Sequence, residues 1–174
     1  MADEDDTKTR RRARLRQVGA WVAAAGVYAA AQGLSAWAAE REAGRGTRPQ
    51  YGEFKRPSFA PPGAVFPVVW TALNLTTATS AWRVWRAGEP DGRTALTWWA
   101  AAVLVRSGYV PLAFGRRQLW AATADSGLLF AVMARYAQLA GRVDQTAGVL
   151  AAPEVAWAAF ATVLSTAVAA GNPG

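Results

Sequence analysis

Long apolar segments separated by short charged connections make up the chain after its first 17 residues. Five such segments each approach the ~20 residues that the hydrocarbon core of a bilayer requires. They cover about residues 18–39, 63–85, 94–114, 118–140 and 148–170. The pattern predicts an all-α integral membrane bundle of five transmembrane helices, which forms one domain over residues 18–172.

The polar connections predict how these helices are arranged. Residues 1–17 are acidic and then strongly basic, which predicts a disordered charged tail rather than a cleaved leader. The connection at residues 40–62 is long, charged and rich in proline, whereas the other three are short. Short connections make consecutive helices antiparallel neighbours. We expect residues 40–62 to form a lid-like loop over the mouth of the bundle.

A soluble, alanine-rich bundle is the alternative to a membrane protein. Soluble helices carry charged residues along an outer face with a period of about 3.6 residues. The first apolar segment has no charged residue between Gln17 and Glu40, and the fifth has only Glu154. The distribution therefore favours a multi-pass protein that is surrounded by the lipid bilayer.

Composition narrows the chemistry further. The 174-residue chain has a net charge of +7, and its basic residues cluster between apolar runs, as expected when a bilayer excludes charge. We therefore expect no nucleic-acid partner. The chain has nine Trp but neither Cys nor His, which excludes disulfides, thiol or imidazole catalysis and the commonest haem ligands. We expect no catalytic residue, no metal site and no required cofactor.

Ionisable residues lie deep inside three of the predicted spans. Each unpaired charge at such a depth costs about 2.5–3.5 kcal/mol, so partners are expected. Arg106 and Asp125 are equally far along the chain from one predicted turn, and Arg135 and Glu154 are equally far from the next. On antiparallel helices each pair lies at one depth. We predict the ion pairs Arg106–Asp125 and Arg135–Glu154, either as structural links between helices or, less favoured, as a proton or ligand relay.

Aromatic and polar residues share single faces of the predicted helices. Trp70 shares a face with Asn74 on the second helix, and Trp157 shares one with Phe160 and Leu164 on the fifth. A lipid-facing surface has no use for Asn74, so these faces should point inward. An apolar cavity walled by indole rings suits a large planar ligand, although interhelical packing and interfacial Trp belts produce the same spacing.

Three ordered blocks resemble one known family. The stretch KRPSFAPPGAVFPVVWTALN, at residues 55–74, is similar to the family pattern K-P-S-W-x-P-P-x-W-V-F-x-P-V-W-T-x-L-Y. The stretches VPLAFGRRQLWAATAD and LAAPEVAWAAFATVLSTAVAAGN resemble the family's third-to-fourth-helix and fifth-helix signatures. Over about residues 18–172 the chain thus resembles a divergent bacterial member of the translocator protein family, also called TspO, tryptophan-rich sensory protein or peripheral-type benzodiazepine receptor.

The resemblance implies a five-helix membrane bundle, often dimeric, that binds tetrapyrroles such as protoporphyrin. We expect a protein of the bacterial cell membrane that binds a porphyrin or similar planar apolar molecule for tetrapyrrole regulation or stress sensing, with a homodimer as one assembly. Two alternatives stay open: a light-dependent porphyrin-degrading enzyme, which we favour less, and a structural or signalling protein with a degenerate pocket. The absence of His and Cys favours metal-free porphyrin over haem.

Several family positions carry over to candidate ligand-binding residues. These are Phe59, Phe66, Trp70, Asn74, Tyr109, Trp157, Ala161 and Leu164. Phe59 replaces a loop Trp of the family pattern, and Ala64 stands where a second loop Trp is usual, which weakens the photochemical alternative. Arg106 and Glu154 replace an Asn and a Tyr, and so add charge near the expected cavity. At the mouth, Lys55 or Arg56 would meet a porphyrin propionate or lie in solvent or lipid headgroups.

Overall fold

The structure, a computed structural model, describes residues 18–19, 22, 26, 51–115 and 118–173. Its long described elements are the α-helices α2 (Val65–Ala87), α3 (Pro90–Val110), α4 (Leu119–Val143) and α5 (Gln145–Gly171). A short 3-10 turn, η1 (Tyr51–Glu53), precedes α2, and a π-helical turn, η2 (Pro111–Gly115), continues α3. The predicted tail, almost all of the first predicted span and the start of the predicted lid fall outside the described residues.

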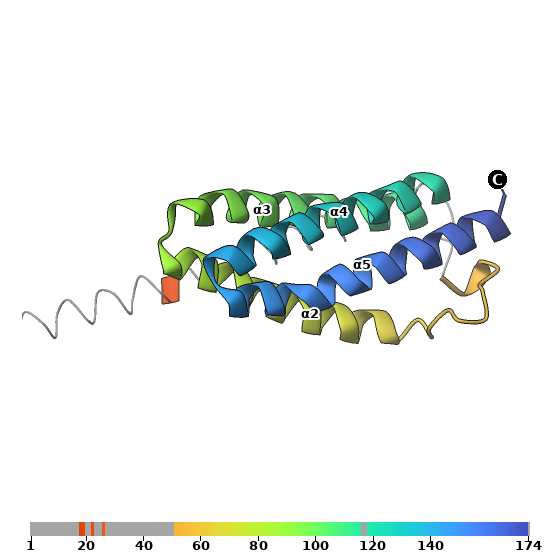
Figure 1. Cartoon of the computed structure of the whole chain (residues 1–174). Helices are drawn as coiled ribbons and strands as arrows, with labels where there is room; N and C mark the ends of the chain where they lie inside the picture. Colours follow the sequence, from red (N-terminus) through yellow and green to blue (C-terminus); the bar gives the residue numbers. More distant parts are fainter. Residues whose placement is uncertain (1–17, 20–21, 23–25, 27–50, 116–117, 174) are drawn as a thin grey trace, which may run out of the picture.

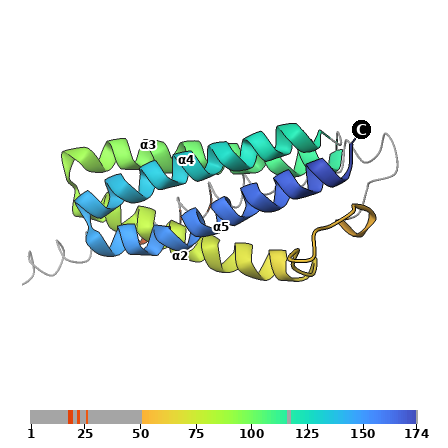
Figure 2. The same cartoon turned by 45° about the vertical axis from the view of Figure 1, so that its right-hand side comes forward.

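Consecutive helices run antiparallel, as the short connections predicted (Figure 1). Helix α5 packs along α4 and also contacts α2, while α3 packs against α4 (Figures 1 and 2). The loop before α2 and the C-terminal end of α5 lie together at one end of the bundle (Figure 2). The helices overlap the second to fifth predicted spans, and the all-α class is confirmed for the part of the chain that the structure describes.

Local sequence explains where the helices begin and end. Helix α2 stops at Gly88, whose φ of 70° is in the left-handed region that favours glycine. Helix α3 begins with Pro90, because the first helical position needs no backbone N–H. The side chain of Asp144 caps α5 by accepting a hydrogen bond from the Ala147 N–H at 3.0 Å. These three signals fix the two turns at the end of the bundle opposite the lid.

Small residues bring α4 and α5 close together. Gly141 and Gly148 face each other, and a Cβ built on Gly148 would lie 2.7 Å from the Gly141 Cα and 3.2 Å from the Ala137 carbonyl oxygen. Close approach through small residues is typical of helices that pack in a membrane, where van der Waals contact replaces the hydrophobic drive. The contact fixes the depth at which residues of α4 and α5 meet.

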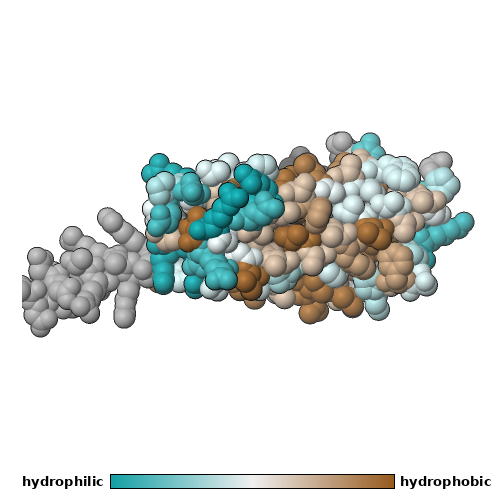
Figure 3. All heavy atoms as spheres, viewed as in Figure 1, coloured by the Kyte–Doolittle hydropathy of each residue, from teal (hydrophilic) through white to brown (hydrophobic). Residues whose placement is uncertain are grey.

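Many large apolar side chains are exposed on the outer surface of the helices. Val68 is 70% exposed and Leu104 is 73% exposed, and large apolar side chains are also exposed on α4 and α5. Figure 3 shows apolar residues gathered over much of one face, with hydrophilic residues concentrated near one end. Within the described residues, α5 is the one helix long and apolar enough to cross a membrane, with a mean hydropathy of 1.6 over its best window.

Candidate ligand-binding cavity

Two adjoining cavities lie between the helices. We call the first the inner cavity; it has a volume of about 190 Å³ and is lined by Phe66, Trp70, Arg106, Tyr109, Val110, Asp125, Ser126, Leu129, Trp157, Ala158, Ala161, Leu164 and Ser165. The outer cavity, of about 360 Å³, is lined by Phe54, Gly63, Phe66, Pro67, Trp70, Tyr109, Val110, Ala113, Phe114, Leu119, Leu164, Ser165 and Val168. Small-molecule sites typically enclose about 300–1,000 Å³, so the outer cavity is of that size and the inner cavity extends it.

The structure brings six of the eight predicted ligand-binding residues to one place. Phe66, Trp70, Tyr109, Trp157, Ala161 and Leu164 all line the inner cavity. The other two lie elsewhere: Phe59 is 51% exposed in the loop, and Asn74 is half-buried on α2 without lining either cavity. Helical spacing placed Asn74 on the face of Trp70, but that face is wide and Asn74 lies a turn further from the cavities.

Aromatic rings form one connected wall of the inner cavity, and Trp157 is at its centre. Its ring centroid lies 6.0 Å from that of Phe66, 6.4 Å from that of Trp70 and 5.3 Å from that of Phe160. The Trp70 and Trp157 rings meet edge to face at 88°, the arrangement that the charge distribution of aromatic rings favours. The wall therefore offers ring faces and edges in fixed orientations to a flat ligand.

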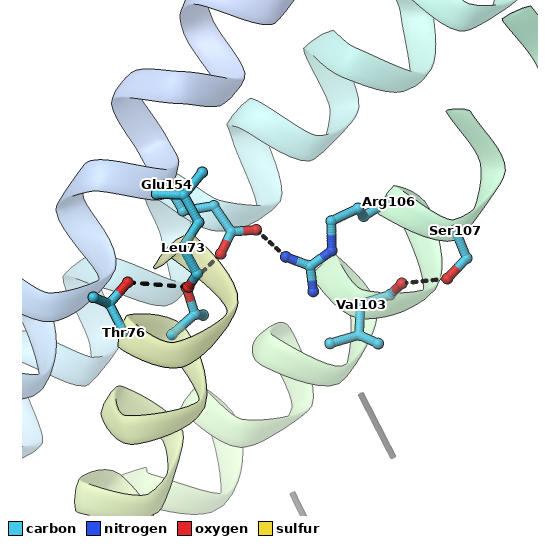
Figure 4. Close-up of polar contacts among 7 residues, drawn as sticks. Leu73, Thr76, Val103, Arg106, Ser107 and Glu154 are labelled. Carbon is cyan, nitrogen blue, oxygen red and sulfur yellow. Dashed lines mark hydrogen bonds and ion pairs between the residues drawn. The ribbon is translucent and has the colours of Figure 1, made fainter. Parts of the chain in front are cut away.

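A buried ion pair joins α3 to α5 beside this wall. Arg106 donates a hydrogen bond to Glu154 (Figure 4). The Thr77 hydroxyl of α2 contacts the other oxygen of the same carboxylate. The Arg106 guanidinium also lies 5.7 Å from the Trp70 ring centre, within the range of a cation–π contact. Glu154 is fully buried, so this pairing is what makes its charge tolerable.

The two ion pairs predicted from depth are therefore wrong. Glu154 binds Arg106 and not Arg135, which is exposed and contacts Gln138 of its own helix. The predicted depth of Asp125 along the bundle was nearly right, because its carboxylate lies against Gly108, two residues after Arg106 on α3. Two residues along a helix correspond to about 200° of rotation, so Arg106 leaves α3 on a different side from Gly108 and reaches α5 instead of Asp125.

A side-chain hydrogen bond lies where the two cavities adjoin. Tyr109 and Ser165 line both cavities, and their hydroxyl oxygens are 2.9 Å apart. The bond joins α3 to α5 and separates the mainly apolar outer cavity from the inner cavity, which carries Arg106 and Asp125. A ligand that fills both cavities would pass this bond or break it.

The loop before α2 docks against the ends of α3 and α5. The Lys55 backbone N–H donates to the Asn172 side-chain oxygen at 2.9 Å, and the Asn172 amide donates back to the Lys55 carbonyl at 3.0 Å. Two ring contacts accompany this bond pair: Phe54 with Phe114 at 6.1 Å, and Phe59 with Phe160 at 6.4 Å. Phe54 thereby becomes part of the outer cavity wall.

Sequence reasoning missed several of these residues. Ser126 and Leu129 line the inner cavity. Leu129 is four residues after Asp125 on the same helix, so its spacing could have indicated it, whereas Ser126 is the next residue, about 100° around the axis. Asn172 carried no such signal, because its partner is the backbone of a loop 117 positions away. Arg106, which was predicted near the expected cavity and as an ion-pair partner of Asp125, lines the inner cavity together with Asp125.

A family model and several known proteins match this chain. The model of the TspO/MBR family matches residues 20–170. The chain belongs to the TspO/MBR family. The chain is 30% identical to protein CrtK of Rhodobacter capsulatus over 126 residues, which cover 71% of this chain and 79% of that protein.

Two further TspO/MBR relatives carry names that refer to their tryptophans. The tryptophan-rich sensory protein of Cereibacter sphaeroides is 31% identical, over 66% of this chain and 72% of its own. The tryptophan-rich protein TspO of Chlorobaculum tepidum is 28% identical, over 71% of this chain and 79% of its own. Proteins of the TspO/MBR family are membrane proteins, so this chain is a TspO-like membrane protein.

Proposed function

We propose that this protein binds a metal-free porphyrin, or a similar planar apolar molecule, in the two adjoining cavities between its helices. The observation that carries the proposal is the aromatic wall of Phe66, Trp70 and Trp157 along a cavity between α2, α3, α4 and α5. Rings held edge to face present flat apolar surfaces, which suit stacking and edge contacts with a planar ligand. The outer cavity has the size of a typical small-molecule site, and the docked loop covers it.

We also propose that the protein crosses the bacterial cell membrane several times. Each of the four described helices is longer than the ~20 residues that a bilayer core requires. Large exposed apolar side chains, such as Val68 on α2 and Leu104 on α3, would face lipid in such an arrangement. The charged pair Arg106–Glu154 is directed into the bundle, where intramembrane charges are tolerated.

The experiment is a titration of the purified full chain in detergent with protoporphyrin IX, followed by quenching of tryptophan fluorescence. Trp70→Phe and Trp157→Phe should each weaken binding several-fold, because a smaller ring leaves part of the wall open. Trp120→Phe is the matched control, since Trp120 is exposed on α4 and lines neither cavity. If both cavity variants bind protoporphyrin IX with the affinity of the unmodified protein, the ligand binds elsewhere.

The same titration separates binding from degradation. A binding protein leaves the amount of protoporphyrin unchanged when the complex is illuminated, whereas a light-dependent enzyme consumes it. A protein with a degenerate pocket shows no saturable quenching with any porphyrin. The loop of this chain has Phe59 and Ala64 at positions where the family pattern has tryptophans, so we expect binding without consumption.

A further inference from the structure

The inner cavity carries polar groups that ordinary packing does not explain. Besides the hydrogen-bonded pair Tyr109–Ser165, its lining includes the polar side chains of Arg106, Asp125 and Ser126. Ser126 donates its hydroxyl to the Ala122 carbonyl of its own helix at 3.1 Å, and Arg106 donates to Glu154. Two further lining residues have a buried polar atom with no hydrogen-bond partner among the described residues: the Trp157 Nε1, which is a donor, and the Asp125 Oδ2, which is an acceptor.

Asp125 lacks a protein partner in the described part of the chain. Its Oδ2 is buried and accepts no hydrogen bond from any described residue. Its other oxygen lies against Gly108 of α3, where a Cβ would be only 2.9 Å from Oδ1. Gly108 thus leaves the space that the carboxylate occupies but supplies no donor to it. Asp125 as a whole is half-buried, but burying a carboxylate oxygen without a donor is costly, which marks this oxygen as an acceptor available to a ligand.

The charges around the inner cavity indicate the charge that the donor group of a ligand should carry. Arg106 lines this cavity, and its charge is paired with that of Glu154, which is fully buried and does not line the cavity. Counted together, these three described residues have a net negative charge, which is carried by Asp125. A ligand carboxylate placed here would meet like charge, whereas a protonated amine would form a charge-assisted hydrogen bond. The outer cavity next to it is lined mainly by apolar and aromatic side chains, so the rest of the same ligand should be apolar.

We infer that the inner cavity is a subsite for a cationic N–H donor, with Asp125 as the acceptor that selects the ligand. The ligand class is a flat aromatic cation with an N–H donor at one edge, with that edge inside and the rings against the aromatic wall. The inference rests on the proposed planar-ligand site and adds the polarity and orientation of the ligand. It also places any carboxylate-bearing edge toward the mouth, where Lys55 and Arg56 are exposed.

Two dyes with one ring system test this inference. 9-Aminoacridine is protonated at neutral pH, whereas acridine is neutral there, and both are titrated into the detergent-solubilised full chain with tryptophan fluorescence as the readout. We expect the protein to bind 9-aminoacridine about tenfold more tightly, the ratio that a charged hydrogen bond of about 1.4 kcal/mol supplies. Asp125→Asn should abolish this preference and leave acridine affinity within about twofold of its original value.

Gly108→Ala provides a second, independent variant. Its added Cβ would displace the Asp125 carboxylate without removing it, so the preference for 9-aminoacridine should fall. Asp91→Asn, which removes an exposed carboxylate in the first turn of α3, is the matched control and should keep the full preference. If Asp125→Asn does not fold, an unchanged preference in Gly108→Ala overturns the inference.

The outcomes separate this inference from the proposed function. Equal binding of the two dyes by the unmodified protein, or a preference that survives in Asp125→Asn, overturns the donor subsite and leaves the planar-ligand site standing. Failure of acridine, 9-aminoacridine and protoporphyrin IX to bind at all overturns both.

Discussion

Asn172 and Lys55 lie 117 positions apart and exchange two hydrogen bonds, one in each direction between the Asn172 amide and the Lys55 backbone. The Asn172 amide also donates to the Val168 carbonyl at 2.8 Å, which fixes it on the last turn of α5. One side chain at the end of the last helix therefore holds the loop that covers the outer cavity. The position of the covering loop therefore depends on α5.

Replacing Asn172 should release this loop. Asn172→Ala loses both bonds to Lys55, each worth about 1 kcal/mol, so trypsin should cleave after Lys55 several-fold faster than in the unmodified protein. Arg56 precedes a proline and is no competing cleavage site. Asn172→Asp keeps the acceptor for the Lys55 N–H but loses the donor. Its cleavage rate should therefore lie between those of the unmodified protein and Asn172→Ala. Identical cleavage rates in all three proteins would show that the ring contacts alone hold the loop.

The ion pair between Arg106 and Glu154 should behave as a unit. Arg106→Met leaves Glu154 buried without its cation, and we expect it to lower the free energy of unfolding by about 3–5 kcal/mol. Glu154→Gln instead leaves the Arg106 guanidinium buried without its counter-ion. The double variant should cost less than the sum of the two single variants, as measured by denaturant titration in detergent with circular dichroism. Additive costs would mean that the two side chains do not depend on each other.

The close contact between α4 and α5 should be sensitive to a single methyl group. Gly148→Ala places a Cβ against the backbone of Gly141 and Ala137, so the helices must separate, at a cost of about 1–3 kcal/mol in unfolding free energy. Gly127→Ala is the matched control on α4, because its nearest neighbour would be a Thr162 methyl at 3.8 Å, an ordinary contact. That control should be neutral or, through higher helix propensity, stabilising by up to about 1 kcal/mol. Thermal unfolding of both variants in one detergent distinguishes them.

Asp144, in the turn between α4 and α5, should stabilise the folded protein at neutral pH but not in acid. The hydrogen bond and charge of Arg83, at 2.8 Å from Asp144, lower the pKa of the Asp144 carboxyl below 3.8, with the α5 backbone N–H groups adding to the shift. A lowered folded-state pKa stabilises the protein above the unfolded pKa, and this contribution is lost as the pH falls through the folded pKa.

Two variants check this term. Asp144→Ala loses the helix cap as well as the ion pair and should cost about 1 kcal/mol at neutral pH. Asp144→Asn keeps an oxygen for the cap, so it should cost less at neutral pH and should lose stability less steeply on acidification toward about pH 3 than the unmodified protein does. Parallel acid-unfolding curves for the unmodified protein and Asp144→Asn would contradict the assignment.

The sequence predicted the helices well because a membrane-length apolar run has few other ways to satisfy its backbone. Spacing along α2 and α5 also predicted that Trp70 and Trp157 lie at one cavity, since residues on one helical face follow from the period alone. The ion pairs failed because depth follows from hairpin symmetry but the direction of a side chain around the axis does not. Arg135 was level with Glu154 and yet points outward.

Other features depend on contacts that no local pattern encodes. The bonds of Asn172 end on backbone atoms of a loop, where any residue would present the same groups. Gly108 could be read as an ordinary small helical residue until the Asp125 carboxylate was found against it. Such pairings depend on how α3 rotates against α4 and α5, which is decided by the packing of the whole bundle.

The ion pair of Arg106 and Glu154 also constrains the order in which this sequence can have changed. The family pattern has an uncharged Asn and Tyr at these positions, so two substitutions separate that state from this one. A chain carrying either charge alone would bury it without a counter-ion, an intermediate that selection for a folded protein would oppose. We therefore expect close homologues to carry both charges or neither, so that the two positions evolve together.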